Sequence, residues 1–206
     1  MAKIEFDASL FSIYAHKVKE QISLLDNFQL PPSKSWIIDW AQLKAFQQLT
    51  RQNNWNQLPV YRDLLINKNS PSIYYFTNEK KDAQRLFELL KKSKQESSYI
   101  RREKGVKEKG FYSISHVPKL FQEGDCIYVG SRKINIHERF KQHLGYGSGR
   151  TGALHLSKVF SLEESIPEIT FHYHILDKKY LKITEHIECV VQNSLNPFIG
   201  KKLLED

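Results

Sequence analysis

With 206 residues, 40% of them apolar and 26% charged, the chain has the composition of a globular protein that forms one domain or two small ones. It contains neither the roughly 18 consecutive apolar residues of a membrane helix nor a secretory signal, and its two cysteines lack metal-ligand spacing, so we expect a protein of the reducing cytoplasm. The net charge of +8 favours a polyanionic partner such as nucleic acid, because a basic surface releases the counterions that a polyanion condenses.

The excess of positive charge lies mainly in the first half of the chain. Residues 1–105 carry 17 Lys and Arg against 11 Asp and Glu, whereas residues 106–206 carry 14 against 12. Residues 91–109 alone hold eight basic and three acidic side chains, with Arg101 and Arg102 among the basic ones. This segment reads equally well as a solvated helix end with a linker and as an arm that contacts phosphates.

Two helices are expected at the start of the chain. Apolar residues recur at helical spacing within residues 8–30 and again within residues 34–66. The pair Pro31-Pro32 separates the two runs, because proline cannot continue a helix.

A strand, a helix and a linker follow. Residues 72–77 are rich in aromatic and β-branched side chains and predict a strand, and residues 79–92 have a helical apolar face. Residues 93–109 are polar and charged, which is typical of a linker or loop. We therefore expect residues 1–105 to be a mainly helical accessory region that supplies DNA recognition, dimer contacts or both.

Residues 106–206 have a different pattern, which predicts a compact α+β domain. Asn135 can cap a helix there, with Glu138 completing a capping box. The expected elements in chain order are strands at 111–115 and 126–130, a helix at 135–144, a strand at 169–176 and a helix from Asp177 to about 194.

Four short motifs in this half resemble those of the GIY-YIG nuclease superfamily. They are Gly110-Phe111-Tyr112, Tyr128-Val129-Gly130, the Arg139–His143 segment, and Glu188 with Pro197 nine residues later. Their order is that of the family, and the resemblance covers residues 110–202. It implies a three-stranded antiparallel sheet flanked by helices, hydrolysis of DNA phosphodiester bonds, and one divalent metal, Mg²⁺ or Mn²⁺, held by Glu188. No nucleotide cofactor is implied.

The residue types fit phosphodiester hydrolysis, which needs an activated water and a charge sink for the transition state. Arg139 and His143 lie four residues apart, so both project from one helix face. Arg139 offers a planar fork for phosphate oxygens, and His143 can relay a proton or bond a tyrosine hydroxyl. We expect Tyr112 to act as general base and Tyr128 to position the phosphate or the water. The carboxylate of Glu188 suits Mg²⁺, which prefers oxygen ligands and keeps several waters.

Two glutamates compete for the metal role on the last helix. On a helical wheel Glu188 lies roughly 100° from the middle of the apolar arc, whereas Glu185 lies roughly 160° away. A ligand at the edge of a buried face can look into a cleft, and one opposite that face looks into water. We therefore assign the metal to Glu188.

The first tyrosine has a rival, and the pattern departs from the family at two points. Ser72-Ile73-Tyr74 copies the first motif without its glycine, but would require a long insertion before Tyr128, so we prefer Tyr112. The interval of 16 residues from Tyr112 to Tyr128 implies a longer loop than is usual in the family. The asparagine that often follows the family's proline is Gly200 here.

Other basic and histidine residues are secondary candidates. Residues 147–152 spell G-x-G-x-x-G but follow a helix rather than a strand, so we interpret them as a loop beside the site and not as a dinucleotide motif. His172 and His174 share a strand face without a third metal ligand, which favours a surface or DNA-facing pair. The candidate substrate-binding residues are Arg132, Lys133, Lys141, Arg150, Arg101 and Arg102.

The expected activity is that of a metal-dependent DNA endonuclease. A small nuclease domain with extra helices resembles restriction-type or mobile-element enzymes, which is an analogy of architecture only. A palindromic cutter would act as a homodimer that matches the symmetry of its site. The alternative is a catalytically weak or inactive nucleic-acid-binding or regulatory protein on the same scaffold, which Gly200 and the long loop favour.

Overall fold

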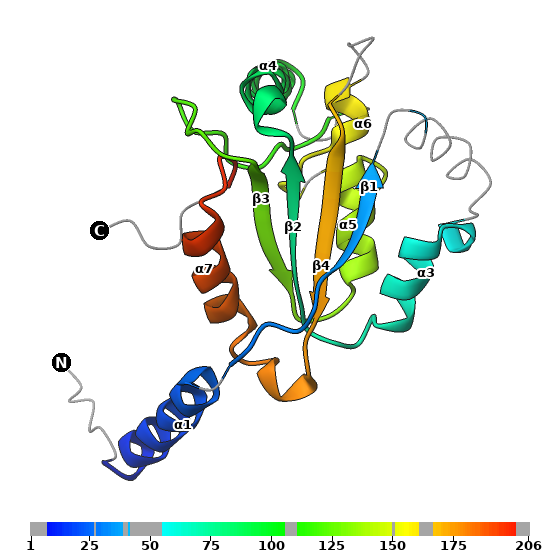
Figure 1. The fold of residues 1–206 in the computed structure, drawn as a ribbon. Coiled ribbons are helices and arrows are strands. Elements are labelled where there is room, and N and C mark those ends of the chain that lie inside the picture. Colours follow the sequence, from blue (N-terminus) through cyan, green and yellow to red (C-terminus); the bar gives the residue numbers. More distant parts are fainter. Residues whose placement is uncertain are drawn as a thin grey trace, which may run out of the picture.

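A computed structural model describes residues 8–26, 28–38, 41, 55–105, 111–149, 151–160 and 167–200, with the backbone alone for residues 8–14 (Figure 1). Within these residues, the chain is organised around one antiparallel sheet of four strands. Their spatial order is β1 (Lys34–Ile38), β4 (Ile169–Ile175), β2 (Ser72–Asn78) and β3 (Cys126–Arg132). The fold is therefore α+β with four strands, where the sequence predicted three.

Both halves of the chain contribute to this sheet. Strands β1 and β2 precede the boundary expected between residues 105 and 106, and β3 and β4 follow it. Strand β2 lies between β3 and β4 and pairs with both. The two later strands are thus joined only through a strand of the first half.

Alternation along the strands divides the sheet into two faces. Tyr74 and Phe76 of β2 belong to the larger core, together with Phe171 of β4. Ile73 of β2 and Val129 of β3 belong to the smaller core on the other face.

Helices complete both cores. The larger core receives side chains from α3 (Pro59–Ile66), α4 (Lys80–Glu103), α5 (Ile136–Leu144), α6 (Leu156–Val159) and the 3-10 turn η1 (Trp55–Gln57). The smaller core is covered by α7 (Thr184–Leu195), which contacts β3 and β2 and follows the 3-10 turn η3 (Lys178–Tyr180). Helix α1 (Ala8–Asp26) projects beyond the sheet in Figure 1. None of the helices in the described ranges combines the length and apolarity of a membrane span.

The helix predicted over residues 34–66 is wrong at its start. Lys34–Ile38 forms β1, whose register places Trp36 opposite Phe171 of β4. Pairing with a distant strand overrides the local helical spacing, and the aromatic and β-branched residues of this segment suit a strand. The predicted run ends in α3, and residues 42–54 lie outside the described residues.

The linker predicted over residues 93–109 is also wrong in its first part. Helix α4 continues to Glu103, and Ser93 and Ser97 are buried on its inner face. The hydroxyl of Ser97 donates to the carbonyl oxygen of Tyr112, and the ammonium of Lys94 donates to that of Ile114 at 2.6 Å. Ser97 and Lys94 of α4 therefore hold the loop that contains Tyr112 and Ile114. The pattern of apolar residues along α4 does not reveal such a role.

The strand predicted over residues 111–115 is wrong. These residues form a loop whose only bridge in the described chain joins Ile114 to Ala153. The helix predicted over residues 135–144 is confirmed as α5, with Asn135 at its N-cap position. The predicted capping hydrogen bond is not made, because Asn135 has a left-handed backbone with φ of 60° and its side chain makes no cap hydrogen bond. The strands predicted near residues 72–77, 126–130 and 169–176 are confirmed as β2, β3 and β4.

Candidate active site

Two tyrosines on neighbouring strands form the centre of the site. Tyr74 of β2 and Tyr128 of β3 stack with ring centroids 6.2 Å apart and planes inclined by 27°. Gly130 lies opposite Tyr74 in the register. A Cβ atom on Gly130 would lie 2.5 Å from Tyr74 Oη and 2.8 Å from Tyr128 Cε1. Glycine is therefore required at this position because the tyrosine rings lie against the backbone.

Arg139 of α5 joins the two tyrosine hydroxyls. Its Nε donates to Tyr74 Oη at 3.0 Å, and its Nη2 donates to Tyr128 Oη at 3.3 Å and to the carbonyl oxygen of Gly152 at 2.7 Å. Its Nη1 donates to Gln142 Oε1 at 3.0 Å. The side chain is only 8% exposed. The fork expected to bind phosphate is thus largely occupied by protein acceptors, two of which are the tyrosine hydroxyls.

His143 lies one turn further along α5 and is fully buried. Its Nδ1 accepts from the backbone N–H of Leu154 at 3.2 Å, which assigns the ring hydrogen to Nε2. Nε2 then donates to Tyr74 Oη, 3.3 Å away. Burial, with the charge of Arg139, holds the pKa of His143 well below its usual range, so the ring is neutral.

The Tyr74 hydroxyl accepts from two donors, Arg139 and His143. Burial nevertheless raises its pKa far above the usual range, an effect that the neighbouring Tyr128 adds to and Arg139 opposes. Tyr74 is 1% exposed. It is therefore a neutral phenol that anchors Arg139 behind Tyr128.

A pocket of about 260 Å³ lies in front of Tyr128. Glu188 of α7 forms part of its wall and accepts two hydrogen bonds, from the Ser131 hydroxyl and from Gln192 Nε2 at 3.2 Å. Burial raises the pKa of Glu188, and the hydrogen bond from Ser131 opposes this. The lining residues are Ser115, His116, Tyr128, Val129, Gly152, Glu188, Gln192 and Gly200.

The other glutamate of the pair has different surroundings. Glu185 is exposed and forms an ion pair with Lys133 at 2.9 Å. Glu188 thus lies at the pocket and Glu185 in solvent, the relative placement that the helical wheel predicts.

A divalent cation fits this donor set. No cluster of three or more His, Cys, Asp or Glu side chains occurs in the described ranges, so a cage made only of such residues is not available among them. Glu188 presents one hydrogen-bonded carboxylate to the pocket, and Gln192 Oε1 is buried without a hydrogen-bond partner nearby. One carboxylate with polar neighbours suits Mg²⁺ or Mn²⁺, since Mg²⁺ retains several waters.

Tyr112 does not occupy the position expected for it. It lies in the loop before β3, with its ring against His155 at a centroid distance of 5.5 Å, and burial raises its pKa. The place beside Tyr128, opposite Gly130, belongs to Tyr74, so the preference for Tyr112 over Tyr74 is wrong as regards position. The alternating burial along β2 indicates that Tyr74 belongs to a strand of the sheet. Ser72 stands where the motif has glycine, which made Tyr74 the weaker match in the sequence.

The predicted basic residues are spread over several surfaces. Arg132 and Lys133 line a second pocket, of about 250 Å³, together with Ser131, Ile134 and Glu185, the partner of Lys133. Lys141 is instead paired with Glu138 at 2.9 Å, and its ammonium lies over the Tyr61 ring at 5.1 Å, on the side of α3.

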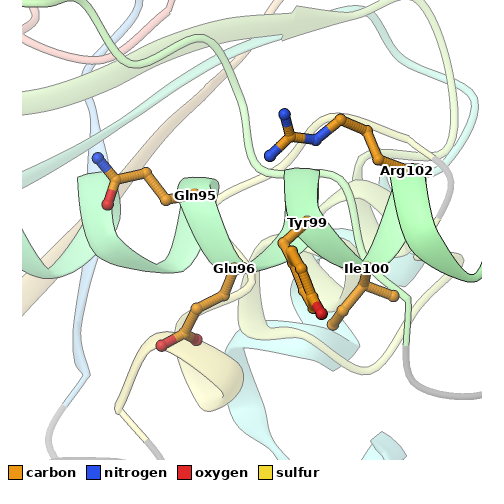
Figure 2. Close-up of a pocket in the computed structure, with 5 residues that line it drawn as sticks. All are labelled: Gln95, Glu96, Tyr99, Ile100 and Arg102. Carbon is orange, nitrogen blue, oxygen red and sulfur yellow. The ribbon is translucent and has the colours of Figure 1, made fainter.

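Arg101 and Arg102 are exposed near the end of α4. Arg102 contributes to a surface pocket of about 570 Å³ that Figure 2 shows on this helix. Its lining residues are Gln95, Glu96, Tyr99, Ile100 and Arg102. None of them lines the pocket of Glu188, and Arg150 lies outside the described residues.

Three polar residues near the site were not predicted. Ser131 and Gln192 hold Glu188, and only the four-residue spacing of Gln192 from Glu188 on one helix was visible in the sequence. His155 is 1% exposed with a left-handed φ of 50°, and burial lowers its pKa to about 4. No local pattern marked it.

His172 and His174 lie on the opposite face of the sheet from Tyr74. His172 Nε2 is 3.0 Å from Thr77 Oγ1, and His174 Nδ1 is 2.6 Å from the carbonyl oxygen of Pro31. Tyr75 stacks on His172 with a centroid distance of 4.6 Å. The pair is therefore a packed part of the sheet, and neither histidine lines the Glu188 pocket.

No family model, curated protein or solved structure matches the chain. Its function is therefore inferred from the geometry and chemistry of the pocket.

Proposed function

We propose that this protein is a divalent-metal-dependent DNA endonuclease of the GIY-YIG type that hydrolyses phosphodiester bonds in the Glu188 pocket. One observation carries the proposal. Tyr74, Tyr128, Arg139 and His143 form a single hydrogen-bonded cluster, and the outermost member, Tyr128, shares a pocket with Glu188. An oxygen ligand for a cation, a positioned hydroxyl and a buried positive charge thus meet at one place.

Charge supports nucleic acid as the substrate. The net charge is +8, and Arg132 and Lys133 line the pocket that borders Ser131. Ser131 also bonds Glu188, so the basic pocket and the Glu188 pocket are neighbours. DNA whose cleaved phosphate lies at Glu188 can place an adjacent phosphate near these two cations. Cleavage of a palindromic site, as by restriction-type enzymes, would require a homodimer.

The proposed mechanism divides the work between the pocket and the cluster behind it. Glu188 would hold a divalent cation, which would supply positive charge to the reacting phosphate and make a nearby water more acidic. Arg139 donates to Tyr128 Oη, so the hydrogen of that hydroxyl remains available for a phosphate oxygen or a water. We assign positioning of the phosphate or the water to Tyr128. Tyr74 and His143 fix the guanidinium of Arg139 and are positioning residues.

The test is cleavage of supercoiled, linear and branched DNA with and without Mg²⁺ or Mn²⁺. We expect Glu188→Gln to lower the cleavage rate at least about 100-fold, because the metal ligand and its charge are lost together. Glu88→Gln makes the same change at an exposed position of α4 that lines neither pocket, so it is the matched control and should retain the wild-type rate. A wild-type protein that cuts none of the substrates, or a Glu188→Gln variant that cuts equally well, contradicts the proposal.

A second candidate is a nucleic-acid-binding protein without catalysis. Three features favour it. Tyr74 is buried, and the donors of Arg139 are occupied by protein acceptors. Gly200 brings no side chain to the pocket. Such a protein would bind DNA with an affinity that falls steeply with salt, yet cut none of the substrates with either metal. Affinity measured between about 50 and 200 mM salt, beside the cleavage assay, separates the two candidates.

A further inference from the structure

We propose that Ser131 and Gln192 are positioning residues that hold the Glu188 carboxylate in the orientation in which it binds a divalent cation. The inference rests on the proposed function, since it assumes a cation at Glu188. It assigns roles to two residues that the motifs do not include.

Each oxygen of the Glu188 carboxylate accepts a hydrogen bond from a side chain. The Ser131 hydroxyl donates to Oε2, and Gln192 Nε2 donates to Oε1 at 3.2 Å. The donors approach from different elements, Ser131 from β3 and Gln192 from one turn further along α7. Two donors on separate supports prevent rotation of the carboxylate about its last bond, which a single hydrogen bond would not.

The two hydrogen bonds leave the carboxylate able to bind a cation. An ionised carboxylate offers about four lone-pair sites, and the two side chains with the backbone N–H of Ser131 use at most three. A lone pair thus remains for a cation.

The side-chain oxygen of Gln192 is a second observation that supports a bound cation. The side chain is 9% exposed and lines the Glu188 pocket, yet its Oε1 has no hydrogen-bond partner in the described part of the chain. A buried acceptor of this kind costs stability unless something supplies a donor. The waters retained by a bound cation are such donors.

The test is the affinity of the full chain for Mn²⁺ alone, measured by titration with electron paramagnetic resonance of the free ion. We expect Ser131→Ala and Gln192→Leu each to weaken Mn²⁺ binding about 10-fold or more, as is usual when a residue that orients a metal ligand is lost. Ser131→Thr keeps the hydroxyl and should bind nearly as the wild type does. In a Glu188→Gln background, Ser131→Ala should have no further effect, because the carboxylate through which it acts is gone.

Matched controls separate this role from a general loss of structure. Ser194→Ala deletes an exposed hydroxyl on the same helix, and Gln84→Leu makes the same change on the exposed face of α4. Both should leave Mn²⁺ affinity unchanged. Circular dichroism monitors folding, and Ser131→Ala decides the question if Gln192→Leu does not fold.

The outcomes distinguish the inference from the proposed function. If wild type binds Mn²⁺ and Glu188→Gln does not, while folded Ser131→Ala and Gln192→Leu bind as tightly as wild type, the positioning role is overturned and the metal site stands. If wild type binds no Mn²⁺, or Glu188→Gln binds it equally well, the cation site of the proposed function fails and the positioning role with it.

Discussion

At the scale of single residues, the close packing of two tyrosine rings against a glycine determines the position of the Tyr128 hydroxyl more than charge does. Gly130 is required because the rings of Tyr74 and Tyr128 lie against the backbone of β3. Tyr74 in turn fixes Arg139, whose guanidinium reaches Tyr128 at the pocket. A steric requirement at one glycine therefore determines where the hydroxyl at the pocket lies.

Replacing this glycine should destabilise the protein. In Gly130→Ala the new Cβ meets Tyr74 Oη at 2.5 Å, and strained packing of this kind costs about 1–3 kcal/mol. Urea denaturation measures the loss. Gly124→Ala is the control, because the nearest heavy atom to its Cβ is 3.8 Å away, and it should change the free energy of unfolding by less than about 0.5 kcal/mol. Equal stability of the two variants would contradict the close approach.

His155 should make the stability of the protein depend on pH. Its pKa is about 4 in the folded protein, against 6.5 for the free side chain. Below about pH 6.5 the unfolded chain takes up a proton that folded His155 resists, so stability is full above this pH and falls as the pH drops towards 4. At about 1.4 kcal/mol per pKa unit the loss reaches up to about 3 kcal/mol.

The measurement is urea denaturation between pH 4 and 7 of wild type and His155→Asn. Asparagine tolerates the left-handed backbone of this position and does not titrate, so the variant should lose part of the slope. The remaining slope belongs to other buried histidines such as His143, whose pKa is also lowered. Identical slopes would show that His155 is not buried as described.

At the scale of elements, helix α4 supports a loop that the sequence presented as a strand. Ser97 and Lys94 donate to carbonyl oxygens of residues 112 and 114, so the loop is held by the helix rather than by the sheet. The strand that pairs with β3 is β2. Strand pairing therefore decides that Tyr74 of β2, and not Tyr112 of the loop, is the first tyrosine of the site.

Removal of the Ser97 hydroxyl should loosen this loop. In Ser97→Ala the carbonyl of Tyr112 loses its donor, at a cost of about 1 kcal/mol, and amide hydrogen exchange should rise over residues 111–115. Ser98→Ala is the matched control, since its exposed hydroxyl donates to the carbonyl oxygen of Lys94 within the same helix. Unchanged exchange in Ser97→Ala would contradict the support by α4.

At the scale of the whole molecule, the sheet joins the two halves of the chain. Strand β2 lies between β4 and β3, and β1 covers the edge of β4. The larger core draws on α3 and α4 as well as on α5 and α6. The C-terminal half thus carries most of the pocket but only two strands of the sheet, and those two do not pair with each other.

The fragment 106–206 should therefore not fold by itself. Without β2, the strands β3 and β4 would have unpaired backbone groups on their facing edges, and apolar residues such as Phe171 would lose their partners. Circular dichroism and urea titration of this fragment, compared with the full chain, test the expectation. Cooperative unfolding of the isolated fragment would show that it is an independent domain.

The sequence alone determined the features that depend on local period. Aromatic and β-branched content predicted β2, a short apolar run predicted β3 and alternation predicted β4. A capping pattern predicted α5, and the helical wheel predicted the position of Glu188 at the edge of a buried face. Tyr128, Arg139 and His143 were likewise identified before their contacts were known. These features follow from the positions of neighbouring residues along one element.

Only the tertiary structure decided which tyrosine stands beside Tyr128, that Lys34–Ile38 is a strand, and that Ser131 and Gln192 hold Glu188. The physical reason is that strand pairing and side-chain hydrogen bonds join residues far apart in the chain. Tyr74 meets Gly130 across a register that no local pattern encodes. The local sequence thus indicated Tyr128, Arg139, His143 and Glu188 as candidates. Pairing between distant strands placed Tyr74, and not Tyr112, beside Tyr128.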